Sequence, residues 1–281
     1  MTQRFYSISS FLRLLLLILV FSGFTRTMAG ERLPNILIFF VDDMGYADIG
    51  PFGARDYPTP NLDKLATSGR CFTDFHVSAP VCSASRSALM TGVLNVRLGI
   101  NGAYSPKSEN GLNPDEMTIA ELVKQKGYAT AAFGKWHLGV HPKMLPTGQG
   151  FDEYEGIPYS NDMWPLHPKY AGLAPDDPER FKVYPPLPYL HNEEVVKSGL
   201  QDEDQAMLTQ WATDAALRFI SKNKDKPFFL YMPYSMVHVP IFASDRFLGK
   251  SGAGLFGDVV MELDWSVGEI IKALDNAGIR E

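Results

Sequence analysis

Short apolar runs and amphipathic stretches alternate along the chain. The apolar runs predict strands at residues 34–41, 128–133 and 227–232. The first of them, PNILIFFV, is continuous and rich in β-formers, which is typical of a strand buried on both faces. The amphipathic stretches predict helices at residues 59–69, 118–127, 204–223 and 258–277. Strands that alternate with helices indicate an α/β fold with a parallel sheet covered on both sides.

Several of the predicted helix ends carry capping signals. Thr59 suits the N-cap of its helix, and Pro60 suits the first turn. Thr118 and Glu121 have the spacing of a capping box. Glycines that can end a helix stand at Gly69, Gly127 and Gly278.

Residues 140–203 depart from this alternation. They hold half of the chain's 20 prolines and show little periodicity. We therefore expect them to form structured loops over one edge of the sheet. After the last predicted helix a further strand is expected, whereas the sequence ends at Glu281. This leads us to expect a chain that is incomplete on its C-terminal side.

Composition narrows the possible classes of function. A chain of 281 residues, of which 45% are hydrophobic, has room for one large domain or two smaller ones. Its net charge of −6 argues against nucleic-acid binding, which needs a basic surface. An anionic ligand must therefore be held by local cations.

The N-terminus predicts export. Arg4 and Arg13 precede an apolar run of 11 residues, 14–24, and small residues at Thr27 and Ala29 follow. This predicts a signal peptide over residues 1–29, with no membrane insertion after cleavage. The alternative, a membrane anchor, is disfavoured because spanning a bilayer takes about 20 apolar residues. We expect a periplasmic or secreted protein, and the absence of an Asn-x-Ser/Thr sequon favours a bacterial one.

Polar residues collect where the predicted strands end. Asp42 and Asp43 follow the first strand, the motif GKWHLG with Lys135 and His137 follows the second, and His238 follows the third. Ligands bind beyond the carboxyl ends of strands in open parallel sheets, so these side chains are expected to converge. Taken singly, the aspartates could be turn formers and the histidines structural.

In the stretch APVCSASRSALMTG, the residues SRSALMTG predict a helix, so Cys82 lies at or just before a helix N-terminus. A helix N-terminus favours an anion, and Arg86 lies about one helical turn further on the same face. Both features favour a reactive thiol. A disulfide with Cys71 remains the alternative, because these are the only two cysteines of the chain.

These motifs together resemble the sulfatase family. CSASR resembles its signature Cys-x-Pro/Ala-x-Arg, with Ala84 at the position where proline is commoner. PNILIFFVDDMGYADIG resembles the N-terminal metal motif and GKWHLG the second signature. GIPYSNDMWP and PFFLYMPYSMVHVP are similar to segments of arylsulfatases and N-acetylgalactosamine-6-sulfatases. The resemblance runs from about residue 33 to the end, in the family's order.

The resemblance implies a fold and a reaction. The fold is an alkaline-phosphatase-like three-layer α/β sandwich with a mostly parallel sheet, of which residues 30–281 would be the N-terminal catalytic part. A further calcium-ligand motif and a C-terminal subdomain of the family are missing from the sequence. The reaction is hydrolysis of sulfate monoesters of aryl groups or carbohydrates. A phosphonate or phosphate monoester hydrolase, or an inactive fragment that binds sulfate esters, is the alternative.

The resemblance also implies cofactors. A separate generating enzyme, or maturase, would oxidise Cys82 to formylglycine, whose hydrate is the nucleophile. Asp42, Asp43 and the oxygen at position 82 would bind Ca²⁺, which prefers hard oxygen ligands. Formylglycine at position 82 excludes the disulfide, so Cys71 is expected to be a buried thiol.

The remaining roles implied by the resemblance concern the substrate. Arg86 would steady the formylglycine hydrate, and His137 would take a proton from its second hydroxyl. Lys135 and His238 would contact the sulfate oxygens or the leaving group. Ser160 would contact the sulfate.

Overall fold

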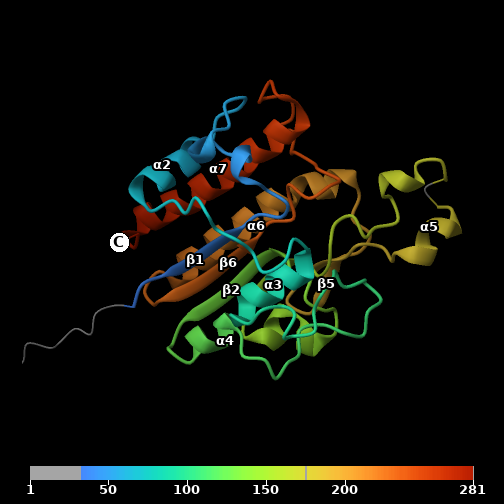
Figure 1. The fold of residues 1–281 in the computed structure, drawn as a ribbon, viewed down its shortest axis with the longest axis horizontal. Coiled ribbons are helices and arrows are strands. Elements are labelled where there is room, and N and C mark those ends of the chain that lie inside the picture. Colours follow the sequence, from blue (N-terminus) through green and yellow to red (C-terminus); the bar gives the residue numbers. More distant parts are fainter. Residues whose placement is uncertain (1–32, 175, 281) are drawn as a thin grey trace, which may run out of the picture. The chain divides into compact units, whose positions relative to one another are not determined.

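A six-stranded sheet in the order β1-β6-β2-β3-β4-β5 lies at the centre of the computed structural model, which describes residues 33–174 and 176–280 (Figure 1). The pairs β1/β6, β6/β2 and β2/β3 are parallel, and β4 and β5 are added antiparallel. The strands are β1 (Ile36–Phe40), β2 (Ala129–Lys135), β3 (Glu153–Ile157), β4 (Tyr189–His191), β5 (Glu194–Lys197) and β6 (Phe228–Pro233). The predicted signal peptide lies outside the described residues.

Helices cover both faces of the sheet. The α-helices are α2 (Pro60–Ser68), α3 (Cys82–Thr91), α4 (Ile119–Lys124), α5 (Pro178–Val183), α6 (Asp202–Asn223) and α7 (Gly254–Ala277). The predicted capping box begins α4: Thr118 Oγ1 accepts from Glu121 N at 3.1 Å, and Thr118 N donates to Glu121 Oε2 at 2.8 Å. No helix in the described part of the chain is long and apolar enough to cross a membrane.

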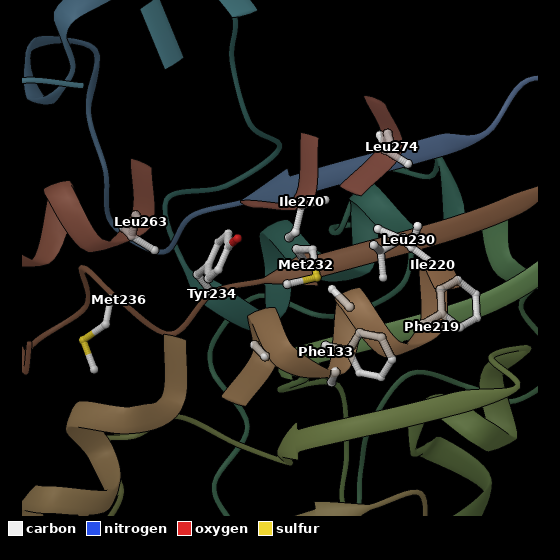
Figure 2. Packing of buried hydrophobic residues seen from close by; sticks show 14 of the residues in the cluster. Phe133, Phe219, Ile220, Leu230, Met232, Tyr234, Met236, Leu263, Ile270 and Leu274 are labelled. Atoms are coloured by element: carbon white, nitrogen blue, oxygen red, sulfur yellow. The ribbon is translucent and has the colours of Figure 1, made fainter. Parts of the chain in front are cut away.

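Strand β6, which lies between β1 and β2, packs against a hydrophobic cluster on each face of the sheet. Leu230 and Met232 face α6 and α7, where Figure 2 shows them among Phe219, Ile220 and Ile270. The intervening residues, Phe229 and Tyr231, pack on the opposite side with residues of α3 and α4. A strand with apolar residues on both faces belongs to the middle layer of a three-layer α/β fold, as predicted.

Two expectations from the sequence were wrong in part. β1 was expected to be buried on both faces, but all five of its residues are only half-buried. β1 is the first strand in the sheet and has a single neighbour, β6, which leaves one edge uncovered. Residues 140–203, expected to be loops, contribute β3, β4 and β5. These strands are only three to five residues long, too short to show periodicity in the sequence.

Two glycines let the strands approach closely below the site. Gly134 in GKWHLG has φ +133°, and a Cβ there would lie 2.2 Å from the carbonyl oxygen of Pro233. Gly156 in β3 has φ +156°, and its Cβ would lie 1.9 Å from the carbonyl oxygen of Gly134. Only glycine fits at both positions, so the carboxyl ends of β6, β2 and β3 can lie side by side.

Candidate active site

Asp42 is the centre of a buried ion network at the carboxyl end of the sheet. Its Oδ2 accepts from Arg86 Nη2 at 3.1 Å and also from Lys135 Nζ. The side chains of Arg86 and Lys135 are completely buried, and that of Asp42 is 6% exposed. Lys135 Nζ also donates to Ser160 Oγ at 2.8 Å. Hydrogen bonds thus link four residues that the sequence singled out, from the segment after β1, from α3, from the end of β2 and from the segment after β3.

The network holds Asp42 ionised. Burial works to raise the pKa of Asp42, but the charges of Arg86 and Lys135 outweigh burial and lower the pKa from 3.8 to about 2. Arg86 is further held by its Nη1, which donates to the Lys135 carbonyl at 2.5 Å, and by the ring of Phe40 at 5.4 Å. Two fixed cations with one carboxylate leave a net positive charge, which suits an anionic ligand.

His137 is a neutral imidazole with a free acceptor nitrogen. Its Nε2 lies 2.9 Å from the Tyr104 carbonyl oxygen, which can only accept, so Nε2 carries the proton. Burial, followed by the charge of Lys135, lowers the pKa of His137 from 6.5 to about 3. Nδ1 is buried and has no partner among the described residues. An unprotonated, unpartnered ring nitrogen can accept a proton from a group bound beside it.

Cys82, predicted to lie at or just before a helix N-terminus, is the first residue of α3. The preceding residue, Val81, makes no side-chain cap, so no N-cap side chain occupies the N-terminal amides of the helix. Tyr104 links this first turn to His137, because its backbone N donates to Ser83 Oγ at 3.1 Å while its carbonyl accepts from His137. Cys82 is half-buried.

The expectation for Cys71 was wrong. Cys71 is exposed rather than buried, and both cysteines are free thiols, so they form no disulfide in the structure. The reason is its place in the loop after α2, where all residues from 69 to 78 are exposed. The Cys71 Sγ lies 3.8 Å from the Ala66 carbonyl oxygen.

Asp43 and His238 form a second, more open part of the site. His238 Nε2 lies 3.8 Å from Asp43 Oδ2, and their side chains are 16% and 64% exposed. Across residues 33–174 and 176–280 no three His, Cys, Asp or Glu side chains are grouped so that they could hold a metal ion. The calcium trio of Asp42, Asp43 and position 82 therefore stays a prediction.

Sequence reasoning missed residues that act through their backbone or through packing. Tyr104 contributes only backbone atoms to the site, and Phe40 contributes only its ring face. Asn161, next to Ser160, is completely buried and hydrogen-bonded to a distant loop. Backbone contacts leave no signal in the residue type, whereas the apolar run that contains Phe40 was visible as a strand.

The family model described as Sulfatase matches residues 34–281. This chain belongs to the sulfatase family. Among the curated sulfatases it is 40% identical to arylsulfatase A of Homo sapiens, over 90% of this chain and 51% of the relative. It is 39% identical to N-acetylgalactosamine-6-sulfatase of Mus musculus, over 94% of this chain and 51% of the relative. The chain thus spans about half the length of the curated relatives it matches.

Solved sulfatase structures share the fold. The PsFucS1 sulfatase from Pseudoalteromonas sp. matches with a TM-score of 0.78 and 31% identity, over 88% of this chain and 53% of that one. Ps i-CgsB in complex with k-i-k-neocarrahexaose matches with a TM-score of 0.70 and 33% identity, over 87% and 55%. The phosphonate monoester hydrolase of Agrobacterium radiobacter, at 16% identity and a TM-score of 0.58 over 88% and 60%, is similar in fold alone. The predicted alkaline-phosphatase-like sandwich is thereby confirmed.

Proposed function

We propose that the protein hydrolyses sulfate monoesters of aryl or carbohydrate alcohols. Membership of the sulfatase family supports this, as do relatives named arylsulfatase A and N-acetylgalactosamine-6-sulfatase. The similarity to Ps i-CgsB, solved with a bound oligosaccharide, supports a sulfated glycan as one class of substrate. We further propose that the protein is exported and that a formylglycine-generating enzyme or maturase is its partner.

The observation that carries this proposal is the buried cation pair beside the first turn of α3. The chain is acidic overall, with a net charge of −6, yet Lys135 and Arg86 are both fully buried around a single carboxylate. Buried charges are costly unless they have partners, and among the described residues Asp42 is the one carboxylate with which Arg86 and Lys135 form ion pairs. A sulfate ester would supply the missing negative charge, with Ser160 Oγ as a further hydrogen-bonding group.

The side chains would divide the reaction among them. Formylglycine at position 82 would supply, as its hydrate, one oxygen to attack sulfur and a second from which a proton must leave. Arg86 would orient that group, and His137 Nδ1 would accept the proton, since it is unprotonated above about pH 3. Lys135 would hold a sulfate oxygen. His238 Nδ1 faces the Val239 carbonyl oxygen, which can only accept, so the imidazole would carry a second proton on Nε2 when it donates a hydrogen bond to the departing oxygen.

Calcium fits the donor chemistry of the two aspartates. Both cations contact Oδ2 of Asp42, so Oδ1 is the oxygen left for a metal ion. The low pKa of about 2 keeps this carboxylate ionised at any ordinary pH. Asp43 would supply a second hard oxygen and position 82 a third. The ion would contribute positive charge at the sulfate oxygens.

Two measurements test the proposal. Peptide mass spectrometry of the protein, co-expressed with a formylglycine-generating enzyme, should show position 82 lighter than cysteine by one sulfur-for-oxygen exchange and two hydrogens. The same preparation should cleave an aryl sulfate in preference to the matching aryl phosphate. Preference for the phosphate would support a phosphate or phosphonate hydrolase. An absence of turnover and of bound calcium would favour a protein that only binds sulfate esters.

A further inference from the structure

Two buried carboxamides join the loops that carry the substrate-facing residues. Asn161 Nδ2 donates to Gln205 Oε1 at 3.2 Å and to the Pro240 carbonyl oxygen at 3.0 Å. Gln205 Nε2 returns a hydrogen bond to the Asn161 carbonyl oxygen at 3.2 Å. Asn161 is fully buried and Gln205 is 1% exposed. Hydrogen bonds of this kind, shielded from water, fix the geometry of the segments they join.

The position of this pair gives it a specific consequence. Asn161 directly follows Ser160, which is bonded to Lys135, whereas Pro240 lies two residues beyond His238. Ser160 follows β3 and His238 follows β6, and these strands are not neighbours because β2 lies between them. The ladder of the sheet therefore does not tie their following loops to each other.

His238 is anchored on both sides. Before it, Val237 N donates to the Asp42 carbonyl oxygen at 2.9 Å. After it, the Pro240 carbonyl accepts from Asn161 Nδ2. The imidazole itself contacts the Val239 carbonyl, 2.6 Å from Nδ1, and Asp43 at 3.8 Å. The Asn161 hydrogen bond thus connects the segment after His238 to the segment that carries Ser160, the partner of Lys135.

We propose that Asn161 and Gln205 are positioning residues that set where His238 stands relative to the sulfate held by Lys135 and Ser160. The inference rests on the proposed function, in which His238 serves the departing oxygen. Lys135 and Asp42 have their own contacts and do not depend on the pair. Disturbing the pair should therefore weaken the hydrogen bond to the leaving group more than the binding of the sulfate.

The test compares leaving groups in the Asn161→Asp variant. The substitution keeps the shape of the side chain but replaces Nδ2 by an oxygen that faces two acceptors, Gln205 Oε1 and the Pro240 carbonyl. A poor leaving group, as in phenyl sulfate, needs the hydrogen bond from His238 more than a good one, as in 4-nitrophenyl sulfate. We expect kcat/KM to fall about 10- to 100-fold for phenyl sulfate and less than about 3-fold for 4-nitrophenyl sulfate.

Two further variants complete the design. Asn161→Ser removes both hydrogen bonds without adding charge, and the same selective loss is expected even if Asn161→Asp does not fold. Asn223→Asp is the matched control, because Asn223 is also a buried asparagine, 3% exposed, whose side chain donates to a backbone carbonyl, that of Phe219 at 2.9 Å. Asn223 lies in α6, the helix that holds Gln205. It lies roughly 27 Å along the helix from Gln205. It should lower thermal stability without changing the ratio of the two kcat/KM values.

The outcomes separate the two proposals. Equal losses for both substrates in the Asn161 variants, or no loss, would overturn the positioning role while leaving the sulfatase function intact. If the unsubstituted protein, carrying formylglycine, cleaves neither of these aryl sulfates, the proposed activity on aryl sulfates fails and the positioning role fails with it. All proteins are to be compared by thermal unfolding and by the extent of modification at position 82.

Discussion

Replacing Asp42 by asparagine removes the single carboxylate shared by two buried cations. Asp42 Oδ2 accepts from Arg86 and Lys135, whose side chains have no exposure to solvent. Asparagine has nearly the same shape, so the change is one of charge. Because breaking a buried ion pair leaves uncompensated charge, we expect the free energy of unfolding at pH 7 to fall by about 3–5 kcal/mol.

The lowered pKa of Asp42 gives a second, independent value for the stability that its ionised carboxylate contributes. A pKa lowered from 3.8 to about 2 corresponds to about 2 kcal/mol in favour of the ionised carboxylate. A group with a lowered pKa contributes this stability fully above its unfolded pKa and loses it as pH falls through the folded pKa. The difference between the two proteins should therefore narrow between about pH 4 and pH 2. This value of about 2 kcal/mol is smaller than the 3–5 kcal/mol expected for Asp42→Asn because it does not include the cost of leaving Arg86 and Lys135 buried without a partner.

Urea unfolding followed by circular dichroism measures both effects. The titrations are run in a chelator, so that metal binding does not contribute to the stability. Asp74→Asn is the matched control, because Asp74 is 91% exposed and its ion pair with His76 lies at the surface. It should leave stability unchanged. An Asp42→Asn protein within about 1 kcal/mol of the unsubstituted one at pH 7 would refute the view that this carboxylate neutralises the buried cations.

Three further predictions concern single positions. Gly134→Ala should lower the free energy of unfolding in urea by more than about 3 kcal/mol, since the added Cβ would lie 2.2 Å from a backbone oxygen. The control is Gly92→Ala, at φ +69° with open space around the added Cβ, which should lower the free energy of unfolding by only about 1 kcal/mol. Thr118→Ala should cost about 1–2 kcal/mol, visible as a lower Tm, through loss of the cap on α4. His137→Ala should lower turnover of an aryl sulfate. Because the pKa of His137 is about 3, protonation of this residue should not reduce the turnover of the unsubstituted protein above about pH 4. A pH profile with a limb near 6.5 that disappears in the His137 variant would contradict this.

The sequence by itself determined the elements whose signals are local. The helix from Thr59 to Gly69 was visible in its caps and is observed as Pro60–Ser68. The helix that begins at Cys82 places Arg86 one turn away, as the spacing predicted. Asp42, Lys135 and His238 could be placed at the carboxyl ends of strands from the sequence. Each of them follows an apolar run at a short distance along the chain.

Tertiary structure alone decided how these elements meet. Asp42 and Lys135 are 93 residues apart in sequence, and Asp42 and Arg86 are 44 apart, so their shared oxygen follows from packing. The half-exposure of β1 depends on its place in the strand order, and the exposure of Cys71 depends on the loop that holds it. The Asn161 contact with Pro240 spans 79 residues and joins the segments that follow β3 and β6, two strands that do not pair with each other. Local patterns encode which residues form a strand or helix, whereas burial and ionisation depend on neighbours that only folding brings together.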